Sequence, residues 1–596
     1  MNKETLAQQE QNSLDVIKRR IKEKTNSLKD SIQLLNNERN AEYKSSELTL
    51  LKTLNIKTDL TSNIVDMVKV NDNIIIGYKV PKNGSQTLLA NNVLSSFKLI
   101  SNENASLEEC PLNESPIYSN KFEADVNNLL KFYTNAEILQ FVKTESNLFI
   151  SFKIGPKESD LKVFYWDVVG NNFVYKGEYS GTSLFSNISK LEFSWKELGR
   201  DRFVSGDCPL VNINDSIFVG NTNGFIRIKN KPTTNNAEKD TILKKELKDS
   251  RQSLENASFA YHQVESLFLI KVQPYKESAY YFIVDTITDT AIEADGLGYS
   301  GVMLPENAGI IYSNGYYLKD GGFKKYDHLD NAAYHYETVK SPNGEDYMYV
   351  FYSLKNNTYY LYNYSIVSKE IDAPIIANGY VSVDNGSLLI SKNDEKNAYG
   401  KIHDIQVWKT SFYSDEYYSS LVKKTVENRI SKIGNSELVK AIGSLNTIVN
   451  FIHNKEVSVS VYDSIIAMID QANDGYHWLK EFSDLKIVEK LKEVKESAYL
   501  VIQEFKKVEE LKSFAEQKIN KVEKDFSSLN NETYIKNDDL AHLMQLIIKI
   551  NAFIGELSSI KNERYIDVSK INTLNDKAEE RRVFVNNKIV ELLAQD

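Results

Sequence analysis

Proline and most of the glycine lie in the middle of this chain. All ten prolines lie between Pro81 and Pro374, and 21 of the 25 glycines lie between residues 61 and 414. Asn-Gly pairs favour tight hairpin turns because both residues tolerate positive φ. Such pairs occur at 83–84, 223–224, 314–315, 343–344, 378–379 and 385–386. The sequence therefore predicts a many-turned β region at about 46–412, between helical segments at 1–45 and 413–596.

Strands in the middle region are apolar on both faces. After the polar turn "SPNGED", the six residues "YMYVFY" from Tyr347 to Tyr352 are all large and apolar or aromatic. Because neighbouring side chains of a strand point to opposite faces, both faces of this strand need a packing partner. A β-propeller meets this need, since its blades stack face against face around a channel. A flat sandwich would show polar–apolar alternation instead.

The spacing of these strands predicts the number of blades. Apolar strands follow polar turns at seven places, and the later ones are about 40 residues apart, the length of one four-stranded blade. We expect seven blades, with six or eight as alternatives, and insertions near 88–140 and 230–258. The second insertion contains "NAEKDTILKKELKDSRQ", which we expect to be helical and charged. "LTLLKTLNI", from Leu48, is expected to pair with the strand "IHDIQVWKT" and close the ring.

The flanking segments show helical periodicity. In the first, apolar residues recur near three- and four-residue spacing, which predicts one long amphipathic helix. In the last, a longer apolar seam runs from Leu491 to Phe526. It predicts either a helical hairpin that buries its own seam or an intermolecular coiled coil. The first stripe comprises Leu14, Ile17, Ile21, Leu28, Ile32 and Leu35.

Composition limits the classes of function. The formal net charge is −10, which argues against a protein that coats DNA, because that affinity comes from neutralised phosphates. Two cysteines, Cys110 and Cys208, are too few for a disulfide framework. The N-terminus does not resemble a secretory signal, and "LMQLIIKINAFIGEL" is interrupted by Lys549, so we expect a packed helix there and no transmembrane segment. These features predict a cytoplasmic protein.

Motifs for catalysis are missing from the sequence, so we expect no catalytic, cofactor-binding or metal-binding residues in this chain. It contains no G-x-x-x-x-G-K-[ST] phosphate loop and no H-E-x-x-H. "FSWKELGRDRF" is the most unusual segment, because it gathers Trp195, Arg200, Asp201 and Arg202. Tryptophan and arginine are enriched where proteins bind one another, so these four residues are the candidate partner-binding site. The alternative is an Arg–Asp network that fixes a long loop.

Several segments resemble one protein family. "FSWKELGRDRF", "LPENAGIIYSNGYYLKDGGFKKYD", "SPNGEDYMYVFY", "APIIANGYVSVDNGSLLI" and "QVWKT" occur in the order found in large bacterial proteins of the "DNA repair ATPase" family, and "KNERYIDVSKINTLNDKAEERR" also matches them. The resemblance implies that this chain is the N-terminal part of a longer protein or one subunit of a split protein. An AAA-type ATPase domain would then follow, and ATP and Mg²⁺ would bind only to that domain.

Together these features predict a non-catalytic recognition and scaffold region. The propeller would hold a partner or substrate protein, and the helical arm would couple it to the motor, with oligomerisation through the ATPase part or the coiled coil. One alternative is a DNA-binding module in which the helical arms or a basic loop such as 238–251 touch DNA. Another is an enzyme in the propeller channel, which requires a converging polar cluster.

Overall fold

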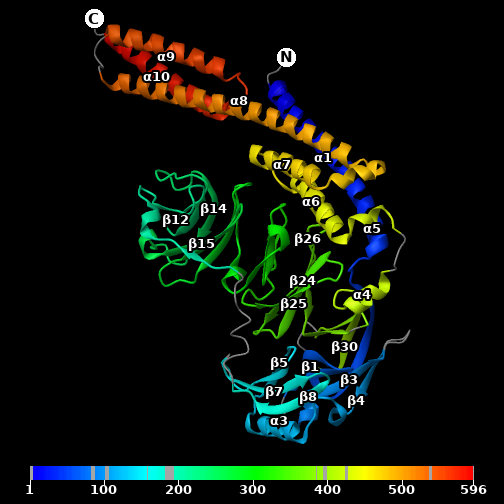
Figure 1. The fold of residues 1–596 in the computed structure, drawn as a ribbon. Coiled ribbons are helices and arrows are strands. Elements are labelled where there is room, and N and C mark those ends of the chain that lie inside the picture. Colours follow the sequence, from blue (N-terminus) through cyan, green and yellow to red (C-terminus); the bar gives the residue numbers. More distant parts are fainter. Residues whose placement is uncertain are drawn as a thin grey trace. The chain divides into compact units, whose positions relative to one another are not determined.

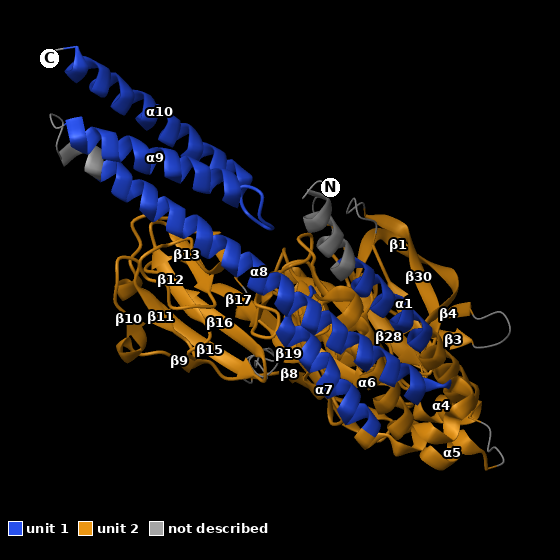
Figure 2. Ribbon diagram, turned by 90° about the horizontal axis from the view of Figure 1, so that it is seen from above, with its two compact units in different colours: residues 1–29, 456–473, 486–596 blue, residues 30–455, 474–485 orange. Residues whose placement is uncertain are grey.

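The computed structural model describes residues 4–81, 87–100, 106–157, 159–180, 193–383, 385–393, 399–422, 427–535 and 540–594. Its contacts divide the chain into two compact units (Figure 2). The helical unit comprises residues 1–29, 456–473 and 486–596, and the sheet unit comprises residues 30–455 and 474–485. The units are defined by contacts between residues and not by position in the sequence. Residues 30–45 and 413–455 therefore lie in the same unit as the strands.

The sheet unit contains six antiparallel sheets among its described strands, and none of these sheets is closed (Figure 1). The first has the order β28 (Gly379–Val383), β29 (Ser387–Ser391), β30 (Gly400–Lys409), β1 (Thr49–Val70), β2 (Asn73–Lys79), β3 (Leu94–Ile100), β4 (Ser106–Cys110). The second has β5 (Glu137–Lys143), β6 (Asn147–Lys153), β7 (Leu161–Val169), β8 (Asn172–Glu178). The third has β10 (Phe203–Val204), β11 (Leu210–Asn212), β12 (Phe218–Thr222), β13 (Phe225–Lys229), β14 (Thr241–Glu246).

The strands of the other three sheets, apart from β9, follow those of the third sheet in the chain. The fourth has the order β18 (Thr290–Glu293), β17 (Tyr280–Asp285), β16 (Leu267–Gln273), β15 (Ser258–Val264), β9 (Lys196–Glu197). The fifth has β19 (Gly301–Met303), β20 (Gly309–Tyr312), β21 (Gly315–Leu318), β22 (Phe323–Lys325). The sixth has β23 (Tyr334–Lys340), β24 (Asp346–Ser353), β25 (Thr358–Ser365), β26 (Glu370–Ile371), with β27 (Ile375–Ala377) also on β25.

Strand β1 takes part in two different pairings. Its first part pairs with β30, where Leu50 lies opposite Trp408, and its second part pairs with β2, where Val70 lies opposite Asn73. The register shifts between Lys57 and Ser62, where one pairing gives way to the other. The predicted pairing between the segment from Leu48 and the strand that ends in "IHDIQVWKT" is therefore confirmed.

Strand β24 is buried on both faces, as the sequence predicted. On one face, Met348, Val350 and Tyr352 join a cluster that includes Leu388 and Ile390 of the first sheet. The opposite face carries Phe351 and Tyr349, which are also buried. The ring of Phe351 packs edge-on against Tyr362, whose hydroxyl donates to the carbonyl of Ser313 in the turn between β20 and β21 of the fifth sheet. The sixth sheet thus packs between two others.

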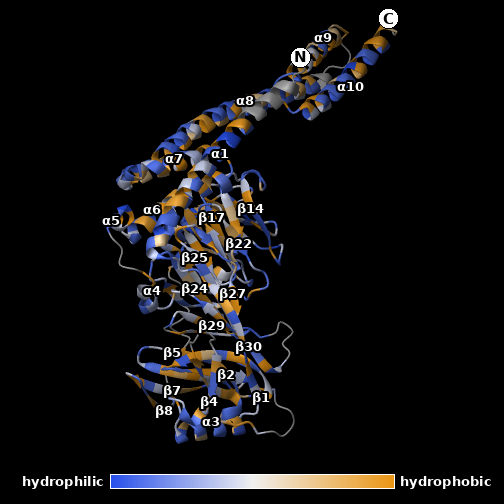
Figure 3. Cartoon of the chain, turned by 90° about the vertical axis from the view of Figure 1, so that its right-hand side faces the viewer, coloured by the Kyte–Doolittle hydropathy of each residue, from blue (hydrophilic) through white to orange (hydrophobic). Residues whose placement is uncertain are grey.

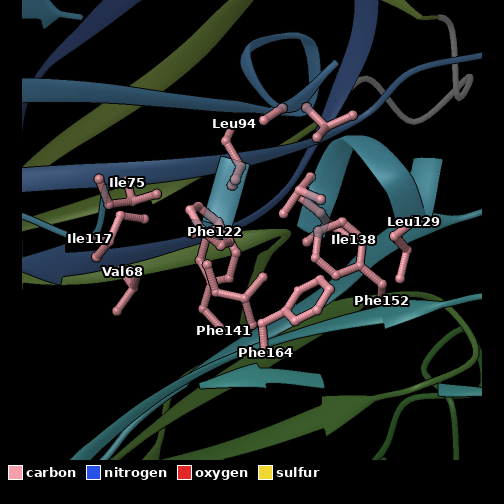
Figure 4. Packing of buried hydrophobic residues seen from close by; sticks show 14 of the residues in the cluster. Val68, Ile75, Leu94, Ile117, Phe122, Leu129, Ile138, Phe141, Phe152 and Phe164 are labelled. Atoms are coloured by element: carbon pink, nitrogen blue, oxygen red, sulfur yellow. The ribbon is translucent and has the colours of Figure 1, made fainter. Parts of the chain in front are cut away.

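Helix α3 (Asn120–Phe132) covers strands of the first and second sheets. Ser119 caps it by accepting a hydrogen bond from the Phe122 backbone N–H, and Phe122 enters the hydrophobic cluster shown in Figure 4. The ring of Phe122 lies 4.7 Å from that of Trp166, edge to face, and the indole N–H of Trp166 donates to the Ile117 carbonyl. Satisfying that donor allows a tryptophan to be fully buried.

One predicted insertion has a different structure. We expected a charged helix in 230–258, but β14 forms there and pairs with β13, for example Ile226 with Lys245. Strand β14 alternates half-buried and exposed residues toward its end, which is the period of a strand at the edge of a sheet. Within 88–140 the chain forms α2 (Ala90–Val93), β3, β4 and α3, so two strands of the first sheet lie inside that predicted insertion.

The remaining helices lie at the two ends of the chain: α1 (Glu4–Tyr43), α4 (Asp415–Leu421), α5 (Arg429–Ile433), α6 (Asn435–Asn454), α7 (Val459–Gly475), α8 (Ile487–Ile535), α9 (Leu540–Ile560), α10 (Val568–Leu593). The predicted N-terminal helix is confirmed as α1, where Ile21, Leu28, Ile32 and Leu35 are buried. The side chain of Leu14 lies outside the described residues.

The C-terminal seam lies on α8, where hydrophobic residues alternate with hydrophilic ones (Figure 3). Within the helical unit, Ala515, Ile519 and Val522 of α8 pack against residues of α9 and α10. That part of the seam is therefore buried by its own chain. Within the described residues, α9 alone is long and apolar enough to cross a membrane, a test that buried core helices also pass.

Candidate functional site: a helix-docking seam on the strand turns

One face of α6 contacts the turns of two sheets in the sheet unit. Three asparagine side chains of α6 donate hydrogen bonds to these turns, and their spacing places them on one side of the helix. We call this face of α6, with Gly443, and the turns that it meets the docking seam. The contacts are Asn435 Nδ2 to the Asn343 carbonyl (2.5 Å), Asn446 Nδ2 to the Val367 carbonyl (2.6 Å) and Asn450 Nδ2 to Asp320 Oδ2 (2.7 Å).

Gly443 allows α6 to lie directly against a strand turn. A Cβ atom at this position would be 2.5 Å from the carbonyl oxygen of Ile366 and 3.0 Å from Cε of Lys369. Since the nearest atom belongs to the backbone, it has little freedom to move away. The close approach therefore requires glycine in the middle of a helix, where glycine otherwise lowers stability.

The turn 341–346 between β23 and β24 is organised by its own side chains. Ser341 Oγ accepts from the Asp346 backbone N–H (2.9 Å) and donates to Asn343 Oδ1 (2.7 Å). Asn343 Oδ1 also accepts from the hydroxyl of Ser46, at 2.6 Å, just beyond the end of α1. Gly344 takes a φ of 68°, the left-handed region that favours glycine. Hydrogen bonds within the turn thus fix the segment that α1 and α6 contact.

A buried ion pair joins α1 to that turn. Arg39 NH2 donates to Glu345 Oε2 at 2.8 Å, and the exposed fractions of the two side chains are 0% and 9%. The same guanidinium donates through NH1 to Asn435 Oδ1 of α6 at 3.2 Å. One arginine therefore contacts the turn and both helices. A buried charge is tolerated only when it is paired and hydrogen-bonded, so this contact fixes the relative position of the three elements.

A second buried ion pair lies just beyond the C-terminal end of α6. Lys455 Nζ lies 3.7 Å from Asp285 Oδ2 of the fourth sheet, and both side chains are almost fully buried. The hydroxyl of Tyr317, from the fifth sheet, donates to the same carboxylate at 3.2 Å. Burial lowers the pKa of Lys455, and Asp285 opposes that shift. The segment around α6 is thus held at both ends, by Asn435 and Arg39 at one end and by Lys455 at the other.

A polar cluster of the kind that a channel enzyme requires is present, but its groups bind one another. Asp66 Oδ2 accepts from the Phe141 backbone N–H (2.7 Å) and from the Tyr359 hydroxyl (3.0 Å). Gln140 donates to that same hydroxyl and accepts from the Tyr334 hydroxyl. Burial raises the pKa of Asp66 to about 7. Because Asp66 is 2% exposed and its oxygens are already bonded, the cluster has the character of a structural network that joins three sheets.

The predicted partner-binding residues lie close together in sequence but have different surroundings. Trp195 is half-buried, and its ring packs against Phe193 (5.3 Å) and Tyr281 (5.8 Å). Arg200, Asp201 and Arg202 form a short 3₁₀ turn in which the first two are exposed and the third is half-buried. The described contacts include no ion pair among these three residues, so the Arg–Asp network that we considered is not observed. Their role in binding stays a prediction.

The basic loop considered for DNA binding has nearby acidic partners. Lys244 lies 2.9 Å from Glu238, and Lys245 lies 2.7 Å from Glu293. Arg251 is paired with Asp249 of the same loop at 3.2 Å. A cation that is already paired attracts a phosphate less strongly, so this loop is a weak candidate for a DNA site.

Sequence reasoning missed the docking seam, although a signal was present. Ile32 and Leu35 belong to the apolar stripe of α1, and Arg39 follows Leu35 at the same helical spacing. Arg39 therefore falls on the buried face of α1, where a charge needs a partner. Its partner Glu345 could not be found from periodicity, because the two residues are more than three hundred positions apart.

A family model described as ATPase involved in DNA repair matches residues 27–477 of this chain. A comparison with curated proteins found no match. Solved structures with partial likeness include the AfRom2 CNH domain, at 10% identity over 62% of this chain and 100% of that one, with a TM-score of 0.22. The Trypanosoma rangeli sialidase matches at 9% identity over 61% and 60%, with a TM-score of 0.20. The β-propeller domain of the Trilobed protease from Pyrococcus furiosus matches at 9% identity over 58% and 95%, with a TM-score of 0.17.

Proposed function

Because this chain belongs to the family described as ATPase involved in DNA repair, we propose that it is the non-catalytic recognition and scaffold region of a larger AAA-type ATPase. Its sheets bind a partner or substrate protein, and its helices couple that protein to the motor. ATP and Mg²⁺ bind the ATPase domain and not these residues. The docking seam and the two buried ion pairs beside it support this proposal, because together they connect α1 and the segment around α6 to the sheets.

The sheets suit recognition if they form a seven-bladed propeller. We propose that β1 divides the first sheet into two four-stranded blades, β28-β29-β30-β1 and β1-β2-β3-β4, which with the other five sheets would make seven. Strand β1 then belongs to the first and last blades and holds them together. The loops of such a ring change without disturbing its core, which makes its faces suitable for binding other proteins.

Photo-cross-linking in the cells that produce the protein tests this proposal. Benzoylphenylalanine replaces Phe323 of β22, which is 59% exposed, or Phe514 of α8, which is 55% exposed. We expect a partner or substrate protein to cross-link at position 323 and an AAA-type ATPase, either as a separate chain or as part of the same protein, at position 514. Hydrolysis of ATP by this chain alone, or cross-links to DNA only, would contradict the proposal.

The family description keeps DNA binding as the second candidate function. This candidate predicts salt-dependent binding to a DNA duplex that weakens when Lys244, Lys245, Lys248 and Arg251 are replaced by glutamine. A chain that binds no duplex at low salt would exclude it. An enzyme in the channel is a third candidate, and the closed hydrogen bonding around Asp66 weighs against it.

A further inference from the structure

A groove opens beside the N-terminal end of the docking seam. Its volume is about 380 Å³, which lies in the range of pockets that bind small molecules or a few side chains of a peptide. One wall is the turn 341–346, and the other is the first turn and a half of α6. Since Arg39 and Asn343 hold both walls in place, the groove is formed before any ligand arrives.

The charge of this groove is positive. Lys340 and Lys440 line it, both are exposed, and the described contacts pair neither amine with a carboxylate. Glu306 is the single carboxylate among the described lining residues, and it is neutralised by Lys369 at 2.7 Å. The first turn of α6 adds partial positive charge, because its N–H groups have no partner within the helix.

Other lining residues of the groove are apolar. Tyr347, Ile366 and Val439 line it together with two prolines, and Ile366 and Val439 are almost fully buried. A ligand that fills this space must therefore offer apolar side chains to these residues and negative charge to the lysines. A simple inorganic anion would leave the half-buried Tyr347 and the two prolines, Pro305 and Pro342, facing water.

A peptide fits these requirements better than a nucleic acid. A duplex gains its affinity from many phosphate contacts along a basic surface, and here two lysines flank one small groove. An acidic peptide segment with apolar or aromatic residues can pair its carboxylates with the lysines and place its side chains in the groove.

We propose that this groove binds an acidic, apolar-rich peptide segment of the partner or substrate protein. The inference rests on the proposed function, since it names the chemistry of the protein that the sheet unit holds. It also gives that binding a route to the helices, because the turn 341–346 that lines the groove contacts α1 and α6 directly.

Fluorescence anisotropy of the full chain with labelled peptides tests the groove. The probe is a short peptide in which aspartate and glutamate alternate with leucine and phenylalanine, and its control carries lysine in place of the acidic residues. Reversal of both charges, Lys340→Glu with Lys440→Glu, is expected to weaken the acidic probe by about tenfold or more. The matched control is Lys355→Glu, an exposed lysine on the turn between β24 and β25 and outside the lining residues, which should change binding by less than about twofold.

A second variant tests whether the peptide occupies the groove, independently of the charge of the lysines. Ser436→Trp places a large side chain at an exposed lining position of α6 and should block the acidic probe without changing the net charge. The proposal is overturned if the acidic probe does not bind, if Lys355→Glu weakens it as much as the double reversal, or if a DNA duplex binds through the same two lysines instead. A partner that still cross-links at position 323 after such a result would show that the groove inference failed while the proposed function held.

Discussion

Arg39 NH2 lies 2.8 Å from Glu345 Oε2, and this pair is buried where α1 meets the turn between β23 and β24. Removing one partner leaves the other charged and unpaired in the interior, which costs about 3–5 kcal/mol. Glu345→Gln is therefore expected to lower the free energy of unfolding by about that amount. Urea titration, followed by tyrosine and tryptophan fluorescence, measures the change.

The matched control for that prediction removes both charges together. Arg39→Met combined with Glu345→Met leaves no buried charge, so we expect the double variant to be more stable than Glu345→Gln. A double variant whose loss of stability equals the sum of the losses in Arg39→Met and Glu345→Met would show that the pair has no coupling energy.

Gly443 gives a second test of the docking seam. Gly443→Ala is expected to lower the thermal unfolding temperature, because its Cβ would meet the Ile366 carbonyl at 2.5 Å. Gly555→Ala, in α9, is the control, since no atom lies within 4 Å of its new Cβ. Alanine is favoured over glycine inside a helix by roughly 0.5–1 kcal/mol, so this control should be neutral or stabilising. Equal effects at the two positions would contradict the close approach of α6.

The pKa of Asp66 predicts a dependence of stability on pH. Burial raises that pKa from 3.8 to about 7, so between these values the folded chain holds a proton that the unfolded chain has lost. Its contribution to stability is fully present below the unfolded pKa and is lost as the pH rises through about 7. Asp346, whose pKa burial also raises to about 7, acts in the same direction.

Asp66→Asn tests this linkage because asparagine has no proton to lose in this range. We expect the fall in unfolding free energy between pH 4 and pH 7 to be smaller in the variant by on the order of a few kcal/mol. Asp289→Asn, at an exposed turn position, serves as the control and should keep the wild-type pH profile. Identical profiles for wild type and Asp66→Asn would contradict the assignment.

The two buried faces of β24 predict that truncation on either face is costly. Met348→Ala removes side-chain volume from one face and Phe351→Ala from the other, and each should lower the unfolding free energy by about 2–5 kcal/mol. Phe323→Ala, at a position that is 59% exposed, should cost much less. If one of the two buried substitutions proved as mild as Phe323→Ala, that face of the strand would be exposed in solution.

Local sequence patterns predicted most of the helices and strands. They did not predict contacts between residues that are far apart in the sequence. The run from Tyr347 to Tyr352 was correctly assigned as a strand covered on both faces, because six consecutive large side chains leave no solvent face. The segment around Lys244 and Lys245 was wrongly assigned as a helix, because its charge outweighed the pairing of β14 with β13, which the sequence does not reveal. The docking seam depends on contacts between distant residues, and a single sequence carries no record of these.

Hydrogen–deuterium exchange of the full chain tests most directly whether the helices are coupled to the sheets through the docking seam. In Glu345→Gln, we predict faster exchange in residues 30–43 of α1, in the first turns of α6 and in the turn 341–346 together, with β12 and β13 of the third sheet unchanged. Faster exchange confined to the turn, with α1 and α6 as protected as in the wild type, would contradict the coupling on which the proposed function rests.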